Sequence, residues 1–555
     1  MYQISNNTAK RSLLSALTLS LIGFAGPVFA QTAATTTEIE VVELTPAQRY
    51  ESALQSLLAD GGNQLADFAS FYAENGYQPI WADGSSAAML ALLTAIEQAP
   101  AHGLAVSRYN VAELEALWVG AKTPEDLAAL EAAAAQSYVK FAKEISSGML
   151  DPRAIHKEMN ATQKVPETSA LLANVASATN MAAYYKTLQP SSPEYTQMLE
   201  LKQELEALVS SEGWGPLVPT GTTLRPGQSG DRVVALRVRL SQRGYDVADT
   251  TSPVFDDVLV EAVKVFQKDF GLNADGLVGP QTLSSINAQP DGRLKQVLVN
   301  LERLRWMNYE LGERHIYVNI PDFMASVMDN GSPTLSFRVV VGTGKNQTAE
   351  FSDTMTHMIA NPTWHVPYSI ASEEYLPQLR ADPTVLQRSN IKMLVRGSGQ
   401  IVDSTAIDYT QFTEDNFPFV LQQRPSSRNA LGLVKFMFPN RFNIYLHDTP
   451  SKSLFARDAR AFSHGCVRVQ KPMEFAYTLL SLQEADPEAA FQRVLNTGKE
   501  TQIDLVSPVP VHIMYRTVWI DSDGQPQYRH DVYNRDKMVF DALVTAGVTL
   551  TTIEG

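Results

Sequence analysis

The sequence contains little cysteine and has a shortage of positive charge, and each of these features excludes some classes of protein. The 555 residues include a single cysteine, Cys466, so no internal disulfide can form, and this residue is either a buried small side chain or a reactive thiol. The formal net charge is −15, with 45 Lys and Arg against 60 Asp and Glu. This sign of charge lacks the attraction to polyphosphate on which nucleic-acid-binding proteins depend, so we expect no nucleic-acid partner.

Long apolar runs are also scarce, and the one near the N-terminus predicts export. Residues 1–30 combine two early cations, an apolar run over residues 13–25, and the small residues Val28 and Ala30 at the positions that a signal peptidase requires. The run is shorter than the ~20 residues that span a bilayer, which favours a cleaved signal peptide over the alternative of a retained membrane anchor. We therefore expect a periplasmic protein, whose net charge without this segment is −17.

The rest of the chain divides into parts with different residue patterns. After a Thr- and Ala-rich spacer over residues 31–45, residues 46–212 carry apolar residues at helical spacing, which predicts a helical scaffold. Residues 213–223 hold two Pro and three Gly and predict a linker, and residues 224–287 predict three short helices. Residues 293–555 begin with an amphipathic helix and then change to strand patterns. The sequence thus predicts a multidomain α+β protein.

Within the last part, we predict a small number of individual elements. The amphipathic helix covers residues 293–307, and a second helical pattern covers residues 475–482. The predicted strands cover residues 315–320, 336–342 and 441–447, and the segment around Cys466.

Cys466 follows Ser463-His464-Gly465 and precedes Val467-Arg468, and this setting predicts a nucleophile. A thiol with an ordinary pKa is only a few per cent thiolate at neutral pH, so it needs a nearby base and donors for the oxyanion that forms on attack. Gly465 lets a substrate approach the backbone, and Arg468 points the same way as Cys466 if the segment is extended. An inert, buried cysteine is the alternative.

His447 is the predicted general base. Apolar and polar residues alternate over residues 441–447, which places Tyr445 and His447 on one face of a strand. Nineteen positions separate His447 from Cys466, enough for two strands to pair and bring the side chains together. His464 lies only two residues from Cys466 and remains an alternative base.

Positive charge gathers around the predicted nucleophile, which suggests an anionic substrate. Residues 421–470 contain eight Lys or Arg against Asp448 and Asp458, a local net charge of +6. The histidines of the chain lack the spacing of a metal site, and one cysteine with one histidine would make a poor zinc site. We therefore expect no metal and no other cofactor.

Residues 224–287 resemble the three-helix peptidoglycan-binding-like domain of bacterial wall enzymes. The matching positions include Val233, Leu236, Leu240, Gly244, Tyr245, Phe266, Gln267, Asp275 and Gly276. Most of these are core or turn residues, so they support the fold more firmly than a ligand site. A docking module that binds no glycan is the alternative.

The catalytic signature carries a second and more specific resemblance. His447-Asp448-Thr449, followed by the motif around Cys466, resembles the active site of L,D-transpeptidases, which are exported cysteine enzymes that cross-link peptidoglycan stems. Residues 361–367, 429–432, 438–440 and 531–533 agree as well. Nearly the whole mature chain resembles the large, scaffold-bearing branch of that family. Thr348-Ala349-Glu350-Phe351 departs from the family's Thr-Pro pattern and puts only a turn in doubt.

The resemblance implies a role for each matching residue. Cys466 is the nucleophile, His447 is the base, and the backbone carbonyl of Asp448 orients the imidazole. The oxyanion pocket comes from His464, Gly465 and Cys466 with help from Tyr445. The residues expected to bind substrate are Tyr445, Arg468, Trp364 and Ser463.

The implied activity is formation of cross-links between third-position diaminopimelate residues of peptidoglycan stem peptides through a cysteine thioester. Peptidoglycan stems and glycan are the expected partners, a peptidoglycan synthase is a candidate partner, and carbapenem β-lactams are expected covalent inhibitors. Water as acceptor would make the enzyme an L,D-carboxypeptidase, and a lipoprotein lysine would make it an anchoring enzyme. A non-catalytic peptidoglycan-binding protein and a papain-like protease are the remaining alternatives.

Overall fold

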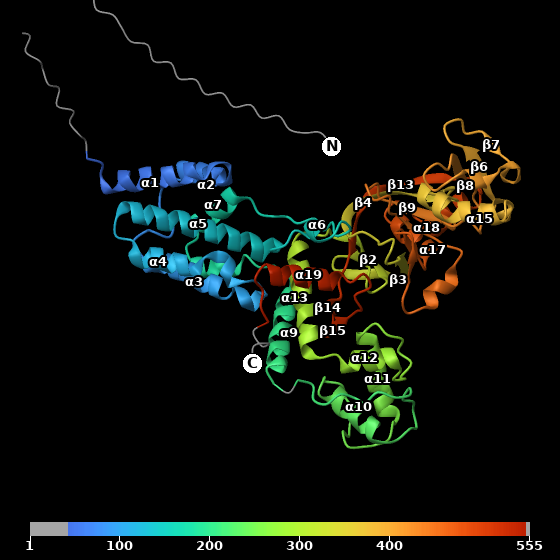
Figure 1. Cartoon of the computed structure of the whole chain (residues 1–555), viewed down its shortest axis with the longest axis horizontal. Helices are drawn as coiled ribbons and strands as arrows, with labels where there is room; N and C mark the ends of the chain where they lie inside the picture. The colour runs from blue at the N-terminus through green and yellow to red at the C-terminus, as the bar shows by residue number, and fades with distance from the viewer. Residues whose placement is uncertain (1–42, 212, 551–555) are drawn as a thin grey trace, which may run out of the picture.

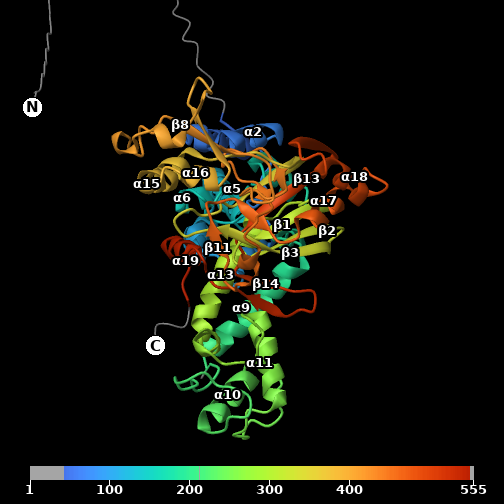
Figure 2. The same cartoon turned by 90° about the vertical axis from the view of Figure 1, so that its right-hand side faces the viewer.

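A computed structural model describes residues 43–211 and 213–550, which form a helical region, a small helical module and a β-rich region (Figures 1 and 2). Both views show the small module, coloured green, projecting from the other two parts. The predicted signal peptide, residues 1–30, and nearly all of the predicted spacer lie outside the described residues. No described helix is long and apolar enough to cross a membrane.

The helical region is built around one long helix, α5 (Pro124–Ser147), which starts at a capping box on Thr123 and is buried along most of its length. This confirms the helical pattern predicted from the sequence. The shorter elements around α5 are α1 (Pro46–Asp60), η1 (Gly62–Gln64), α2 (Ala66–Glu74), α3 (Ser86–Glu97), η2 (Ala99–His102), η3 (Val106–Tyr109), α4 (Val111–Gly120), α6 (Pro152–Ile155), α7 (Thr168–Ala176), α8 (Met181–Lys186) and α9 (Pro193–Val209).

The small helical module contains the three predicted helices: α10 (Asp231–Ser241), α11 (Asp257–Asp269) and α12 (Pro280–Asn287). The predicted apolar stripes form its core, and Leu236 and Phe266 are fully buried there. These elements confirm the three-helix fold of the module.

Residues 213–223 are not the free linker that their Pro and Gly content predicted. Trp214 and Val218 are buried in the same core as the module. The side-chain amide of Asn287 also forms two hydrogen bonds with the backbone of Val218, at 3.0 and 2.9 Å. Buried apolar area and these hydrogen bonds fix the segment against the module.

Helix α13 (Pro290–Trp306) joins the module to the β-rich region, and it is buried on nearly all sides instead of being amphipathic. Its charged residues are enclosed in ion pairs: Arg305 contacts Glu302 at 2.7 Å, and Arg303 contacts Asp536 at 2.5 Å. A charge in a protein interior is tolerated when it is paired and hydrogen-bonded. The sequence pattern alone gave no sign of Asp536 as a partner of Arg303, because the two residues are far apart in the chain.

The β-rich region is centred on a nine-stranded sheet, counted within the described residues, in the order β11-β3-β12-β10-β9-β4-β13-β1-β2. Because β2 also pairs with β3, the sheet curves and closes on itself around an apolar core. Its strands are β1 (Arg314–Asn319), β2 (Met324–Asp329), β3 (Ser332–Gly342), β4 (Phe351–Ala360), β9 (Val434–Met437), β10 (Leu446–His447), β11 (Ala461–Ser463), β12 (Val467–Val469) and β13 (Thr501–Met514). Strands β1 and β3 confirm two of the predictions, and η7 (Lys452–Ala456) lies between β10 and β11.

The predicted strand over residues 441–447 is wrong except for its last two residues, which form β10. The side chain of Asn440 closes a turn instead: it accepts from the backbone N–H of Phe442 and of Ile444 and donates to the Ile444 carbonyl at 2.7 Å. Asn443 has a positive φ of 53°, which is incompatible with a strand. Alternation of apolar and polar residues could not reveal this local competition.

An insert over residues 364–423 has a separate core of its own and was not predicted. Its sheet has the order β5-β8-β6-β7. The elements are β5 (Trp364–His365), α14 (Tyr368–Ile370), η4 (Ala371–Tyr375), α15 (Leu376–Ala381), α16 (Val385–Arg388), β6 (Ile391–Val395), β7 (Ile401–Val402), η5 (Ser404–Ala406), η6 (Tyr409–Gln411) and β8 (Phe419–Gln423).

The C-terminal part of the chain returns to the other regions. Helix α17 (Pro472–Leu480) confirms the helical pattern predicted over residues 475–482, and α18 (Pro487–Leu495) follows it. The hairpin of β14 (Val518–Ile520) and β15 (Pro526–Tyr528) reaches the small module, where the rings of Tyr528 and Phe270 stack with centroids 5.0 Å apart. Helix α19 (Arg535–Thr545) packs against α13. The C-terminal segment therefore links all three regions.

Candidate active site

Cys466 lies in the loop between β11 and β12, next to the start of β10. β10 and β12 are parallel neighbours, with His447 opposite Arg468. One residue earlier, the N–H of Val467 donates to the carbonyl of Tyr445 at 3.1 Å, which places Tyr445 beside Cys466. Tyr445 and Cys466 lie one residue outside these strands, and the side chains gather there: the rings of Tyr445 and His447 have centroids 5.6 Å apart, the phenol is hydrogen-bonded to the thiol, and the charge of Arg468 acts on both the thiol and the imidazole.

The thiol of Cys466 is protonated at neutral pH. Its side chain is half-buried, and Sγ lies 3.6 Å from the carbonyl oxygen of Asn443, to which it donates. Burial raises the pKa of the thiol to about 11, although hydrogen bonding to Tyr445 and the charge of Arg468 lower it in part. The site therefore needs a base to activate its nucleophile.

His447 has a strand position next to that of Cys466 and the protonation state that a base requires. Its ring is buried, and Nδ1 lies 2.5 Å from the carbonyl oxygen of Asp448. A carbonyl can only accept, so Nδ1 carries the hydrogen and Nε2 keeps a free lone pair. Burial, followed by the positive charges of Arg468 and Lys435, lowers the pKa of His447 to about 3. The imidazole is neutral and ready to take a proton.

The side chain of Asp448 holds the backbone that orients His447. Its carboxylate accepts from the N–H of Leu433 at 2.9 Å, from the N–H of Thr449 at 2.6 Å and from Lys452 at 2.5 Å. It also packs against Gly432, where an added Cβ would lie 2.2 Å from Oδ2. Asp448 thus acts on the imidazole through its carbonyl, while its carboxylate stabilises the loop.

We call residues 463–466 the catalytic loop. Two of its residues, Ser463 and Gly465, have contacts that differ from the roles expected for them. The side chain of Ser463 is 2% exposed; Oγ donates to the carbonyl of Cys466 at 2.5 Å and accepts from the N–H of Gly465 at 3.1 Å. Ser463 therefore shapes the loop and does not face substrate. Since the N–H of Gly465 is already bonded, the amides of this loop that have no protein acceptor within the described residues are those of His464 and Cys466, and either is open to an oxyanion.

His464 does not point toward the thiol. Its side chain is 41% exposed, and Nε2 contacts the carboxylate of Glu374 in the insert. His447, in contrast, lies on the same strand face as Cys466. His447 therefore stays the predicted base, while the His464 side chain is engaged by Glu374.

Arg468 and Trp364, both expected to bind substrate, have different surroundings. Arg468 lies opposite His447, and within the described residues its buried Nε has no hydrogen-bond partner. Burial lowers the pKa of this guanidinium, which remains charged and suited to a carboxylate. Trp364 is half-buried against the core of the insert. It belongs to β5, a strand of the insert's own sheet, and not to the strands that carry His447 and Arg468.

Fewer cations lie at the site than the local net charge of +6 over residues 421–470 suggested. Arg460 is buried and donates to the carbonyl oxygens of Val339 and Phe323, and Lys452 is paired with Asp448. Arg468 and Lys435 are the cations that act on His447. Lys435 lies opposite His447 on β9 and was not singled out in the sequence analysis.

A cavity of about 390 Å³ opens beside the catalytic loop. Its wall includes His464, Gly465, residues 344–347 and, from the helical region, residues 156–158. The sequence analysis predicted neither the residues that the helical region adds to this wall nor the contact of Glu374, in the insert, with His464. A cluster of Phe at positions 412, 417 and 419 is the signal that could have indicated a second core.

Within residues 43–211 and 213–550, no group of three or more His, Cys, Asp or Glu side chains could hold a metal ion.

Comparisons with known proteins agree with this site. Residues 313–511 match a family described as "L,D-transpeptidase catalytic domain", residues 66–202 match "Scaffold domain", and residues 229–286 match "Putative peptidoglycan binding domain". A "Putative L,D-transpeptidase" of Haemophilus influenzae is 33% identical over 246 residues, which cover 44% of this chain and 49% of that protein. The chain thus spans about half the length of this relative.

Two further similarities are weaker. N-acetylmuramoyl-L-alanine amidase CwlL of Bacillus licheniformis is 38% identical over 73 residues, covering 12% of this chain and 19% of that protein. The crystal structure of an L,D-transpeptidase from Stackebrandtia nassauensis is 13% identical with a TM-score of 0.20, covering 54% of this chain and 97% of that one.

The closed sheet carries a thiol and a neutral imidazole on neighbouring strands of an α+β fold, an arrangement typical of sites that use a cysteine nucleophile. The part of the chain that carries this site is similar to the catalytic domain of L,D-transpeptidases, and the matches to a scaffold domain and to a "Putative peptidoglycan binding domain" precede it along the chain.

Proposed function

We propose that this protein is an exported L,D-transpeptidase that joins third-position diaminopimelate residues of peptidoglycan stems. The observation that carries the proposal is the neutral imidazole of His447 on the same strand face as the Cys466 thiol, with Nδ1 fixed by the Asp448 carbonyl at 2.5 Å. The match of residues 313–511 to the catalytic domain supports the same reaction class. The N-terminal segment of the sequence supports export to the periplasm.

In the first half-reaction, Sγ of Cys466 attacks the carbonyl carbon between the third and fourth residues of a donor stem. The thiol proton passes to Nε2 of His447, and the N–H of Cys466 stabilises the oxyanion. The carbon–nitrogen bond then breaks, His447 returns the proton to the leaving amine, and D-alanine departs. A thioester on Cys466 remains.

In the second half-reaction, the side-chain amine of an acceptor diaminopimelate attacks the thioester. His447 accepts a proton from this amine, the carbon–sulfur bond breaks, and the proton returns to Cys466. One peptide bond is broken and one is made, so the exchange is close to balanced in bond energy. Arg468, with its unpaired Nε, is the proposed partner of a stem carboxylate.

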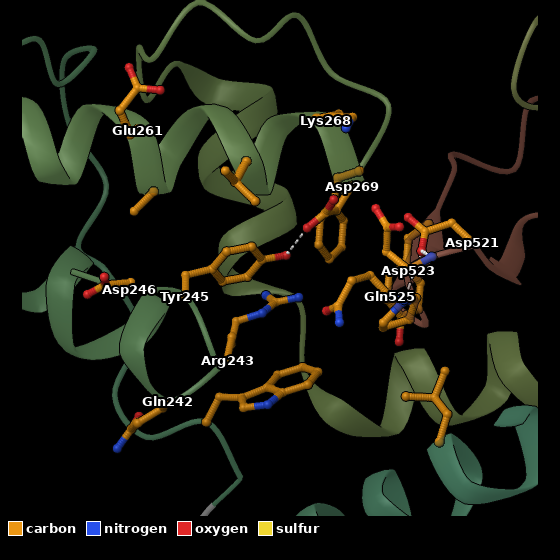
Figure 3. Close-up of a pocket in the computed structure, with 18 of the residues that line it drawn as sticks. Gln242, Arg243, Tyr245, Asp246, Glu261, Lys268, Asp269, Asp521, Asp523 and Gln525 are labelled. Carbon is orange, nitrogen blue, oxygen red and sulfur yellow. Dashed lines mark hydrogen bonds between the residues drawn. The ribbon is translucent and has the colours of Figure 1, made fainter. Parts of the chain in front are cut away.

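The small helical module supports attachment to the wall. A cavity of about 970 Å³ lies between the turn after α10 (residues 242–246), α11, the end of α9 and the β14–β15 hairpin. In Figure 3, Tyr245 and Arg243 extend into this space, the Tyr245 hydroxyl donates to Asp269 at 2.9 Å, and Asp521 faces them from the hairpin. Aromatic surface with polar oxygens at its rim suits sugar hydroxyl groups, so we assign the wall polymer to this cavity.

The reaction is tested by mass spectrometry of muropeptides made by the purified enzyme and by its Cys466→Ala variant. The proposal expects cross-links between two third-position residues with the wild type and none with the variant, whose melting temperature stays close to that of the wild type. Products carrying a free third-position carboxyl would identify water as acceptor and overturn the transpeptidase assignment. Transfer to a lipoprotein lysine alone would overturn it as well.

Wall attachment needs a separate test, because removing the whole module would expose Trp214 and Tyr528. Tyr245→Ala removes an aromatic wall of the cavity, together with its hydrogen bond to Asp269 and its contact with Phe266, and should weaken binding to isolated sacculi while leaving turnover of soluble stems within about twofold. The exposed Lys140→Ala on α5 serves as control. Equal sacculus binding by wild type and Tyr245→Ala would contradict the assignment of the cavity.

A further inference from the structure

Thr348 is a buried hydroxyl that no step of the proposed reaction uses, although it touches the catalytic loop. Its side chain is fully buried. Oγ1 donates to the carbonyl of Gly465 at 2.8 Å and accepts from the N–H of Gly342, at the end of β3, at 2.9 Å. Thr348 begins the segment in which the sequence departs from the family's Thr-Pro pattern. The hydroxyl thus joins the sheet to the loop that carries the nucleophile.

The hydrogen bond to Gly465 controls the direction of the Cys466 amide. A trans peptide unit is planar, and its C=O and N–H point in opposite directions. When Thr348 holds the Gly465 carbonyl, the N–H of Cys466 is therefore directed away from Thr348. Gly465 has a φ of 113°, so backbone preference alone does not set this orientation. Within the described residues that amide has no protein acceptor.

Thr348 is itself held by Arg535, a fully buried residue at the start of α19. The guanidinium donates to the Thr348 carbonyl at 3.0 Å and to Gln347 Oε1 at 2.8 Å. It also pairs with Glu350 at 2.6 Å. The Arg535 side chain thereby fixes both flanks of Thr348.

The helical region also forms hydrogen bonds with the segment that contains Thr348. The N–H of Glu350 donates to the carbonyl of Glu158 at 2.8 Å, and the N–H of Asn160 donates to the carbonyl of Glu350 at 3.0 Å. A continuous set of hydrogen bonds therefore runs from the helical region through residues 348–350 to Gly465. Networks of this kind orient a group more strictly than one contact does.

We infer that Thr348 is a positioning residue that aims the Cys466 N–H at the oxyanion of the acyl-transfer reaction. The inference rests on the proposed function, because it assumes carbonyl attack by Cys466. A residue with this role affects reactions that build an oxyanion, and it spares reactions of the same thiol that build none.

The experiment compares two reactions of Cys466 in the full-length protein. Thioester formation with a purified tetrapeptide stem passes through an oxyanion and is followed by intact mass. Alkylation by iodoacetamide is a displacement at a saturated carbon, in which a carbon–sulfur bond forms, iodide leaves and the thiol proton goes to solvent. The ratio of the two rates therefore isolates the oxyanion contribution.

Thr348→Val should slow thioester formation by at least about tenfold and by no more than the roughly 10²–10³-fold that complete loss of an oxyanion donor costs. Alkylation should change by less than about twofold, and Thr348→Ser should restore thioester formation because it returns the hydroxyl. Thr168→Val is the matched control: Thr168 is equally buried, accepts from Lys143 at 2.8 Å and lies far along the chain in α7. Its rate ratio should equal that of the wild type.

Three results would overturn the inference: wild-type thioester formation by Thr348→Val, equal loss of both reactions, or failure of Thr348→Ser to restore the rate. If Thr348→Val does not fold, Thr348→Ala removes the same hydroxyl with a smaller side chain and is judged by the same ratio. Failure of the proposed function looks different, because the wild-type protein itself would then form no thioester.

Discussion

Raising the pH from 7 to 11 should convert Cys466 from a slow to a fast nucleophile toward iodoacetamide, because its thiol has a pKa of about 11. Burial of the side chain is the main cause, and it disfavours the charged thiolate. At pH 7 only about one molecule in 10⁴ would carry the thiolate, against a few per cent for an ordinary cysteine. Alkylation at pH 7 should thus be on the order of 100 times slower than that of an ordinary thiol.

Acyl transfer should not follow this pH dependence. His447 is neutral above a pKa of about 3 and removes the thiol proton as the carbonyl is attacked. The rate of thioester formation should therefore stay nearly constant between about pH 5 and pH 9, where alkylation rises about tenfold per unit. The separation of the two profiles is the signature of a neutral thiol–imidazole pair.

The assay measures ultraviolet absorbance of the thiolate against pH, using Cys466→Ala as the blank, together with both rates by intact mass. Arg468→Gln provides a check of sign: loss of this positive charge should raise the pKa of the thiol further and raise the pKa of His447. Thiolate absorbance appearing below pH 8 in the wild type would refute the reasoning and indicate a thiolate–imidazolium ion pair.

Three further predictions concern the residues around the thiol. Gly432→Ala should destabilise the fold by about 2 kcal/mol or more, measured by denaturant unfolding, because the new Cβ meets the Asp448 carboxylate at a positive φ of 62°; unchanged stability would contradict the packing of that carboxylate. His464→Ala should slow thioester formation less than about threefold, whereas His447→Ala should cost 10²–10⁴-fold; the reverse ranking would exchange their roles. Because burial depresses the pKa of His447, its contribution to stability is present above pH 6.5 and is lost as the pH falls toward 3, by up to about 5 kcal/mol. His447→Gln should flatten this acid limb of the unfolding free energy, and an unchanged limb would argue against a buried neutral imidazole.

Elements with a strong internal pattern could be predicted from the sequence. The apolar spacing of α10 and α11 follows the helical period, and strands β1 and β3 follow the pattern of two buried strands. The motif around Cys466 and the polar pair Tyr445 and His447 also identified the strand face on which the site is built. Local sequence is sufficient where the determining contacts are close in the chain.

Features determined by distant partners could not be predicted. The burial of α13 depends on Asp536, which follows it by more than 200 residues and neutralises Arg303. The occupied N–H of Gly465 depends on the rotamer of Ser463, and the turn before β10 depends on the side chain of Asn440. In each case a specific hydrogen bond or ion pair determines the local structure, and the spacing of apolar residues carries no information about such contacts.

The most direct test of the account is the intact mass of the protein after brief incubation with a purified tetrapeptide stem. We expect a mass gain equal to the mass of the stem minus the mass of the released D-alanine, located on the peptide that contains Cys466 and absent from Cys466→Ala. The adduct should disappear when an acceptor stem with a free diaminopimelate amine is added. An adduct on another residue, or no adduct while D-alanine is released by Cys466→Ala at the wild-type rate, would contradict acyl transfer through this thiol.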